Sequence, residues 1–193
     1  YLTRLLEDTF LCPITSHRGG RWCLNEIIVK ELELLDYQVD CTCTPGISWG
    51  SHPGWSAGSR GSDWSNYGNQ PFRLTYPQGK IIKESGIVEI PVTSVRKMGR
   101  GTSKWFRPTG SNLMELLGIL DYLYIEKAAY IEFMLHSSEL MPGGSPTFRL
   151  KGQIEKLYED LDILFCEIRQ YGFQGIGISD YAKRYNKERG EGL

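Results

Sequence analysis

The sequence predicts an α/β fold in which parallel strands, joined by helical crossovers, form a sheet or a barrel. Its 193 residues alternate between segments with helical apolar spacing and short β-prone runs, and the connections are brief. This alternation is typical of parallel strands, because a crossover helix returns the chain to the start of the next strand. The length suits one domain with a sizeable core.

The predicted elements follow one another in a regular order. Helices are expected at residues 1–8, 24–35, 111–126, 147–170 and 180–187. Strands are expected at residues 12–15, 37–44, 129–136 and 173–179. Gly172 lies where a glycine that ends a helix belongs. Short β-like runs at 72–76, 80–83 and 87–93 surround the turn Pro77-Gln78-Gly79, which predicts an inserted β-hairpin.

Charge and hydropathy exclude two classes of partner. The chain has 22 basic and 23 acidic residues without a basic stripe, so a nucleic-acid partner is not expected. No apolar run approaches the ~18 residues of a membrane span. The first residues lack the basic start and apolar core of a signal peptide, and there is no initiating Met. Two cellular locations are compatible with these features, the cytoplasm and the cell envelope of a bacterium.

Five cysteines at irregular spacings do not form the pattern of a disulfide framework. Cys41 and Cys43 lie two residues apart on a predicted strand, so their side chains would face the same side and could share a metal. No second pair of Cys or His stands nearby to complete four ligands. Two small buried side chains are the preferred interpretation.

Residues 45–71 are the least regular part of the chain. They are rich in glycine and serine and also contain the aromatic residues Trp49, Trp55, Trp64 and Tyr67. Disordered segments are poor in aromatic residues, so an ordered loop is predicted. The rings could anchor the loop to the body of the protein, or they could stack on the apolar faces of sugar rings.

Several polar residues lie near the ends of predicted strands. His136 ends one strand and, with Glu139, could serve as a general acid or base; the alternative is a core histidine bonded to the backbone. Arg18 or Arg21, separated by two glycines, could hold a carboxylate or merely clamp a surface acid. Asp40 could bind a histidine from a neighbouring strand, or be a solvated residue at a strand end.

Three segments together resemble a known family: Arg18-Gly-Gly-Arg-Trp22, Val39-Asp40, and Met134-Leu-His-Ser-Ser-Glu-Leu-Met-Pro-Gly-Gly-Ser-Pro146. They are similar to the later motifs of NodB-type polysaccharide deacetylases (carbohydrate esterase family 4), especially the branch found with bacterial surface-polysaccharide biosynthesis. The resemblance implies a distorted (β/α)7-type barrel, here lacking its first strands. It also implies metal-dependent hydrolysis of N-acetyl or O-acetyl groups on a sugar or polysaccharide.

The resemblance also implies roles for individual residues. By position, Arg18 matches the arginine that orients the catalytic-base aspartate, Asp40 the aspartate that orients the catalytic histidine, and His136 that histidine. Trp22 and Trp49 fall where the family has groove aromatics. The residues expected to contact the carbohydrate substrate are Trp22, Trp49, Glu139 and Arg21.

Two earlier motifs of the family are absent from the sequence: a Thr-Phe-Asp-Asp type strand and a His-x-x-x-His pair. The histidines stand at 17, 52 and 136. The divalent metal of the complete protein, expected to be zinc, would therefore not find its ligands in this chain. Residues 1–193 are expected to be the C-terminal portion of a single deacetylase-like domain, inactive alone. The alternatives are a degenerate relative and a non-catalytic carbohydrate-binding relative. Formation of a homo-oligomer is a further possibility.

Overall fold

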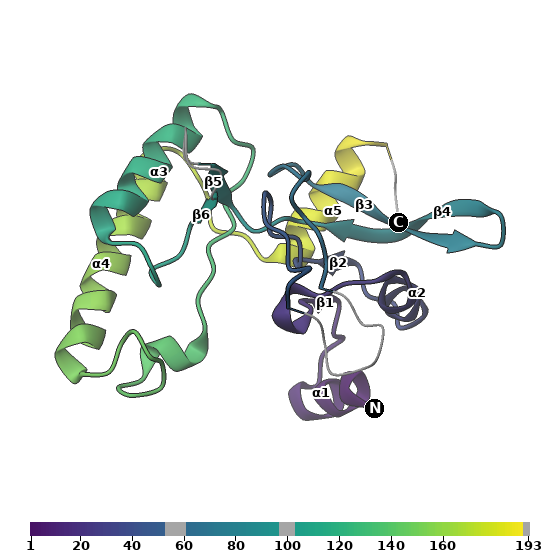
Figure 1. Cartoon of the computed structure of the whole chain (residues 1–193), viewed down its shortest axis with the longest axis horizontal. Coiled ribbons are helices and arrows are strands. Elements are labelled where there is room, and N and C mark those ends of the chain that lie inside the picture. The colour runs from purple at the N-terminus through teal and green to yellow at the C-terminus, as the bar shows by residue number, and fades with distance from the viewer. Residues whose placement is uncertain (53–60, 97–102, 191–193) are drawn as a thin grey trace. The chain divides into compact units, whose positions relative to one another are not determined.

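The computed structural model describes residues 1–52, 61–96 and 103–190 (Figure 1). The chain divides into two compact units. The first is formed by Tyr1–Val92 and Ile176–Leu193, and the second by Thr93–Gly175.

The first unit is built on a four-stranded mixed sheet. Its strands are β1 (Ser16–His17), β2 (Val39–Asp40), β3 (Phe72–Gln78) and β4 (Ile81–Glu89), and their order is β1-β2-β4-β3. β2 lies parallel to both β1 and β4, whereas β3 is antiparallel to β4. Parallel pairing continues past β2, because Val92 N donates to Cys43 O. Parallel strands are thus present, while the closed barrel stays a prediction.

The predicted hairpin is present, and its second strand also pairs with the parallel part of the sheet. The β-like runs expected at 80–83 and 87–93 belong mainly to one strand, β4, which follows a turn at Gly79 with a φ of 65°. The first half of β4 pairs with β3, and its last residues pair in parallel with β2. The sequence predicted two separate β-like runs because Ser85 and Gly86 interrupt the apolar residues. In the structure these two residues lie within the strand and do not end it.

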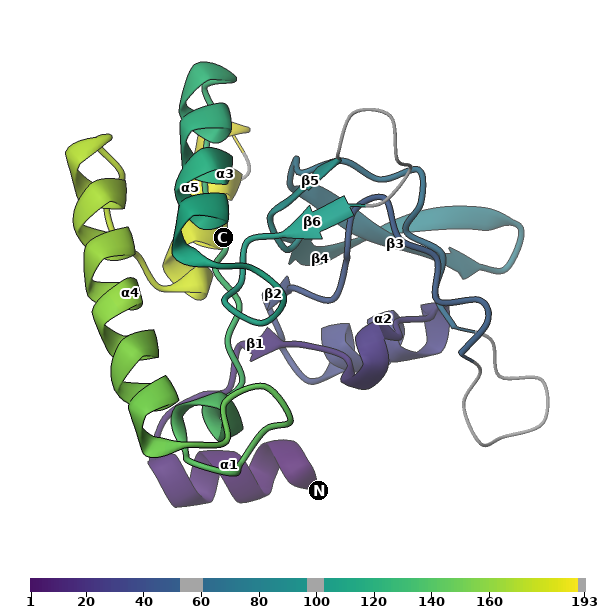
Figure 2. The same ribbon diagram turned by 60° about the vertical axis from the view of Figure 1, so that its left-hand side comes forward.

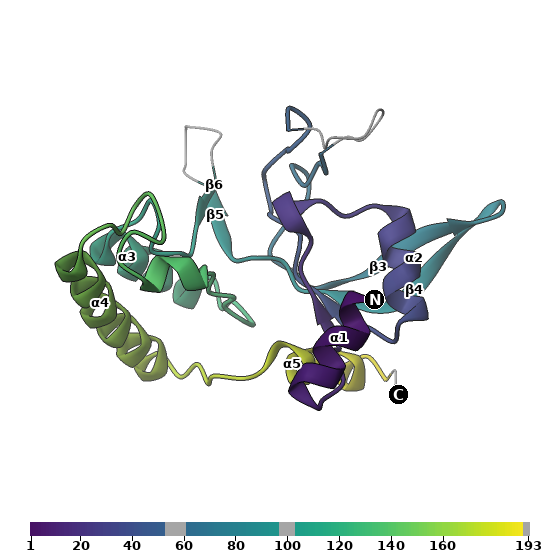
Figure 3. The ribbon, with the colours of Figure 1, turned by 90° about the horizontal axis from the view of Figure 1, so that it is seen from below.

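The helices of the first unit are α1 (Leu2–Phe10), α2 (Glu26–Leu34) and α5 (Ile178–Glu188), with a short 3-10 turn, η1 (Gly20–Trp22). All three helices were predicted. α2 begins at Asn25, whose side chain accepts the N–H of Ile28. It covers the β3–β4 hairpin (Figure 2). Its Val29 and Leu32 form an apolar core with residues of the hairpin. α5 contacts β2 and lies near the C-terminal end of the chain (Figure 3).

A charged cluster fastens α2 to the hairpin. Glu33 Oε2 accepts hydrogen bonds from the Tyr76 hydroxyl and from Lys83 Nζ, the latter at 3.0 Å, and Glu33 Oε1 accepts the N–H of Gly86 at 3.0 Å. Burial alone raises the pKa of Glu33, but these hydrogen bonds outweigh burial and lower the pKa below its ordinary value.

We expect Glu33→Gln to reduce the free energy of unfolding by about 1 kcal/mol at pH 7. Because the pKa of Glu33 is lowered by folding, its contribution is present above the unfolded pKa and is lost as pH falls through the folded pKa. Urea unfolding at pH 7 and pH 3 measures this. Glu31→Gln, on the exposed side of α2, is the matched control and should change little. A loss for Glu33→Gln that is as large at pH 3 would contradict the assignment.

The second unit combines a two-stranded antiparallel sheet, β5 (Ser94–Arg96) and β6 (Ser103–Trp105), with helices α3 (Leu113–Ile125) and α4 (Lys151–Gln170) and the 3-10 turn η2 (Ser137–Leu140). α3 and α4 lie side by side (Figure 2). Asn112 and Glu115 form a capping box at the start of α3. Gly172, with a φ of 89°, follows the end of α4 as predicted. Within the described ranges, none of the helices combines the length and apolar character of a membrane crossing.

The strands predicted at 129–136 and 173–179 are not formed, and the strand predicted at 12–15 is displaced to β1 at Ser16–His17. Residues 129–136 and 173–177 have no regular structure, and α5 already begins at Ile178. Two glycines, at 175 and 177, weaken the second segment as a strand. In the first segment, Glu132 N donates to Thr93 Oγ1 and Met134 N to Phe106 O. This segment is therefore held by residues next to β5 and β6, but it forms no ladder.

Candidate functional site

Three ionisable side chains stand at the ends of the three parallel strands in the first unit. His17 ends β1, Asp40 ends β2 and Glu89 ends β4. The register places His17 beside Asp40 and Asp40 beside Glu89, so the three residues form a row across the sheet. The carboxyl ends of parallel strands are where α/β proteins commonly bind ligands.

Asp40 is the centre of this row. Its side chain is fully buried; Oδ2 lies 2.5 Å from His17 Nδ1, and Oδ1 accepts the N–H of Thr42 at 2.9 Å. Burial alone raises the pKa of Asp40, but hydrogen bonds from His17, Glu89 and Thr42 outweigh it and hold the pKa below its ordinary value. Asp40 is therefore an ionised carboxylate at neutral pH. The prediction that it binds a histidine is confirmed, and the bound histidine is His17.

Glu89 is buried next to Asp40 and supports it. Its Oε1 accepts the N–H of Cys43 at 2.7 Å, and a hydrogen bond between the two carboxyl groups lowers the pKa of Asp40. A hydrogen bond between two carboxyl groups requires a proton on one of them. Since Asp40 is the ionised partner, this interaction predicts a protonated Glu89, which the substitution Glu89→Gln tests. Sequence reasoning did not select Glu89, which lies within the predicted β-like run 87–93.

His17 is oriented by a carboxylate and remains accessible. Its side chain is 25% exposed, and its ring meets that of Tyr37 edge-on at a centroid distance of 6.1 Å. Since Asp40 only accepts hydrogen bonds, Nδ1 of His17 is the donor. An imidazole held in this way can act as a general acid or base through Nε2. Sequence analysis gave His17 no role; its position directly before Arg18 was the available signal.

The segment after β1 folds closely over the end of β2. Gly19 is buried, its N–H donates to Thr42 Oγ1 at 2.7 Å, and a Cβ here would lie 2.2 Å from Cys23 O. Arg18 is exposed; its Nε donates to Cys41 O at 3.2 Å, and its guanidinium lies 5.5 Å from the Trp22 ring. Arg21 is exposed and takes a left-handed conformation, with a φ of 55°. The predicted carboxylate contacts of Arg18 and Arg21 stay predictions.

The aromatic residues of the loop have different roles. Trp64 is buried, and its Nε1 donates to Trp22 O at 3.1 Å, so this ring anchors the loop. Trp49 is half-buried and donates from Nε1 to Thr44 Oγ1 at 2.8 Å. Tyr67 is exposed and packs edge-on against Trp64. Trp55 lies outside the described residues. Contact of Trp49 or Trp22 with a sugar stays a prediction.

His136 and Glu139 form a second histidine–carboxylate pair, in the second unit. The side chain of His136 is 60% exposed, so it is not a core histidine, and its Nδ1 lies 3.6 Å from Glu139 Oε2. Glu139 is buried and accepts hydrogen bonds from Arg107 Nη2 at 3.0 Å, from the Thr109 hydroxyl and from His136 N at 2.9 Å. Glu139 thus fixes the turn that presents His136, and its contact with a sugar stays a prediction.

We expect Glu139→Gln to reduce the free energy of unfolding by about 2 kcal/mol, because the buried ion pair with Arg107 loses its negative partner. The measurement is chemical unfolding monitored by fluorescence. Glu155→Gln is the matched control: Glu155 forms an exposed ion pair with Lys151 on α4 and should contribute little. Equal effects of the two substitutions would show that the Arg107–Glu139 pair does not stabilise this turn.

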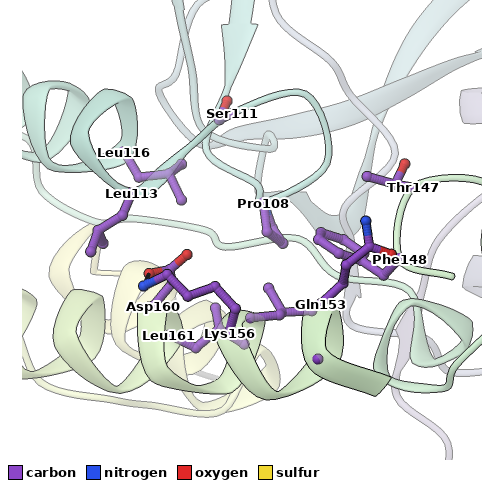
Figure 4. A pocket seen from close by; sticks show the side chains of 12 residues that line it. Pro108, Ser111, Leu113, Leu116, Thr147, Phe148, Gln153, Lys156, Asp160 and Leu161 are labelled. Atoms are coloured by element: carbon purple, nitrogen blue, oxygen red, sulfur yellow. Dashed lines mark hydrogen bonds and ion pairs between the residues drawn. The ribbon is translucent and has the colours of Figure 1, made fainter. Parts of the chain in front are cut away.

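A cavity of about 410 Å³ lies between α3, α4 and the preceding loops (Figure 4). Leu113 and Leu161 contribute apolar walls, while Ser111 and Gln153 add polar groups. Lys156 and Asp160 form an ion pair of 2.8 Å on α4 at its rim. Neither His136 nor Glu139 lines this cavity, so it is separate from the pair that they form.

The predicted catalytic residues fall in different units. Arg18 and Asp40 belong to the first unit and His136 to the second, so the pairing of Asp40 with His136 stays a prediction. Within the described ranges, no three His, Cys, Asp or Glu side chains are grouped to hold a metal ion. The divalent metal that the resemblance implies for the complete protein, with its ligands outside this chain, stays a prediction. Cys41 and Cys43 are buried, and Cys41 Sγ donates to His17 O at 3.3 Å.

Comparisons with known proteins give no relative from which a role could be transferred. No protein-family model, no curated protein and no solved structure matches the chain. The two groups of ionisable side chains suited to proton transfer are the row His17–Asp40–Glu89 in the first unit and the His136–Glu139 pair in the second.

Proposed function

We propose that the chain is part of a hydrolase that removes acetyl groups from the nitrogen or oxygen atoms of a sugar or polysaccharide. The observation that carries the proposal is the buried, ionised Asp40 at the end of β2, with an imidazole nitrogen 2.5 Å from its Oδ2. A carboxylate-oriented imidazole at such a strand end suits proton transfer. The substrate class comes from the motif resemblance to NodB-type deacetylases.

Deacetylation requires proton transfer at two atoms. Water adds to the acetyl carbonyl carbon and loses a proton; the bond from that carbon to the sugar nitrogen or oxygen then breaks, and the leaving atom gains a proton. In the proposal, the exposed imidazole of His136, backed by Glu139, delivers the second proton. The first proton is taken up by a carboxylate that Arg18 orients, as the resemblance implies. No step is assigned to a metal, since the described residues do not group its ligands.

Acetate release by the complete gene product tests this function. The substrates would be N-acetylated and O-acetylated oligosaccharides, assayed with added divalent metal and after chelation. His136→Ala is expected to lower acetate release by about 10²-fold or more, the usual contribution of a general acid. Glu155→Gln, on an exposed face of α4, should leave the rate unchanged.

Two outcomes would contradict the proposal in different ways. Normal acetate release by His136→Ala would remove His136 from the reaction. Binding of oligosaccharides by the unaltered protein without any acetate release would support the non-catalytic carbohydrate-binding alternative. The exposed Tyr67 and half-buried Trp49 would then be the first rings to test by substitution.

A further inference from the structure

We propose that the cavity between α3 and α4 binds an acyl chain whose head group is an uncharged amide or ester. The cavity lies wholly within the second unit and is separate from the His136–Glu139 pair, so this inference goes beyond the proposed function and does not depend on it. It is carried by the length of the cavity along α4, by its apolar walls and by an oriented amide donor at one end.

The cavity is a trough that follows one face of α4. Its lining residues on this helix recur every three to four positions and are Gly152, Gln153, Lys156, Leu157, Asp160 and Leu161. At a rise of about 1.5 Å per residue, the span from Gly152 to Leu161 is about 13 Å long. The volume of about 410 Å³ is within the range of about 300–1,000 Å³ that is usual for small-molecule sites. A narrow, extended ligand fits this shape.

The walls of the trough are apolar. Leu116 of α3 and Leu157 and Leu161 of α4 are buried residues that line it, and Phe148 lines it next to the start of α4 (Figure 4). A hydrocarbon chain would remove this apolar surface from water at no cost in hydrogen bonds. A sugar ring against the same leucines would leave its hydroxyl groups without partners. The body of the ligand is therefore an alkyl chain.

Gln153 provides an oriented donor at the end of the trough where α4 begins. Its Oε1 accepts the N–H groups of Arg149 at 2.8 Å and of Leu150 at 2.9 Å, which fixes the plane of the amide. Its Nε2 has no partner within the described part of the chain, and the side chain extends toward Thr147 at the rim (Figure 4). A carbonyl oxygen is the complementary group, because it accepts the hydrogen bonds that Nε2 donates.

The charges beside the trough favour an uncharged head group. Lys156 Nζ lies 2.8 Å from Asp160 Oδ1 and 3.8 Å from Glu159 Oε2, so its charge is already balanced. A ligand carboxylate would have to compete with these two acids for Lys156. A ligand ammonium would face Nε2 of Gln153, from which it cannot accept a hydrogen bond. The carbonyl of an amide or ester has neither disadvantage.

Titration of the 193-residue chain with octanamide, octanoate and octylammonium tests the ligand class in ¹H–¹⁵N spectra. We expect octanamide to bind saturably, with shifts at the residues that line the trough, and the two charged probes to bind at least about ten-fold more weakly. Glucose is the carbohydrate control and should cause no shift at these residues. Absence of saturable octanamide binding, or equal or tighter binding of glucose or of a charged probe, overturns the inference.

Two substitutions test the site itself. Gln153→Glu keeps an acceptor for the N–H groups of Arg149 and Leu150 but replaces the donor Nε2 by oxygen, so octanamide should bind about ten-fold more weakly. Leu113→Trp should fill the trough and weaken binding at least as much. Met114→Trp, at a neighbouring residue that is 75% exposed and does not line the trough, is the matched control and should bind like the unaltered chain. Circular dichroism and the melting temperature establish that each variant is folded. Unchanged octanamide binding by folded Gln153→Glu or by folded Leu113→Trp overturns the inference.

Discussion

Gly19→Ala is expected to destabilise the first unit by about 3 kcal/mol, at the upper end of the usual cost of overpacking. A Cβ at this position would lie 2.2 Å from the backbone oxygen of Cys23 and 3.2 Å from Thr42 Cγ2. A backbone oxygen cannot move away as easily as the end of a flexible side chain can. Moving Cys23 would also disturb the hydrogen bond from Gly19 N to Thr42 Oγ1, which holds this segment to the residues following β2.

The neighbouring glycine provides the control for this prediction. A Cβ on Gly20 meets no atom within 4 Å, so Gly20→Ala should change the free energy of unfolding by less than about 1 kcal/mol. Urea unfolding followed by tryptophan fluorescence measures both variants. If Gly19→Ala were as stable as Gly20→Ala, the close packing of this segment on β2 would be wrong.

The helices were predictable from sequence because their signals are local. α3 begins at the capping box of Asn112 and Glu115, and α4 ends before Gly172, each within a few residues of the predicted boundary. α4 begins at Lys151, later than predicted, because Gln153 Oε1 accepts the N–H groups of Arg149 and Leu150 at its start. These features depend on neighbours in the sequence, which is why one chain suffices to identify them.

The strands and the site depend on partners distant in sequence. Residues 129–136 have the composition of a strand, but Met134 N bonds to Phe106 O without a ladder around it. Likewise, Asp40 was recognisable as a strand-end acid, whereas its contacts with His17 and Glu89 required the register of β1, β2 and β4. No local pattern gives that register, because the three residues are separated by 23 and 49 positions.

Asp40→Asn is expected to reduce the free energy of unfolding by about 3–5 kcal/mol at pH 7, the cost of removing one partner from a buried charged pair. The amide keeps the shape of the side chain but loses the charge that faces His17 Nδ1. Because folding lowers the pKa of Asp40, its contribution is present above the unfolded value of 3.8 and is lost as pH falls through the folded pKa. The difference in stability between the unaltered protein and Asp40→Asn should therefore shrink below about pH 4.

Glu89→Gln tests whether the stability of the row His17–Asp40–Glu89 requires a charge at Glu89 or only the shape and hydrogen bonds of its side chain. If Glu89 carries a proton, glutamine reproduces its bonding: the amide NH₂ donates to Asp40, and the amide oxygen accepts the N–H of Cys43. Chemical unfolding at pH 7 should then show a change below about 1 kcal/mol, although Glu89 is as fully buried as Asp40. A loss as large as that of Asp40→Asn would mean that Glu89 is ionised. Two adjacent buried carboxylates would repel each other, and the lowered pKa of Asp40 would then need another cation to explain it.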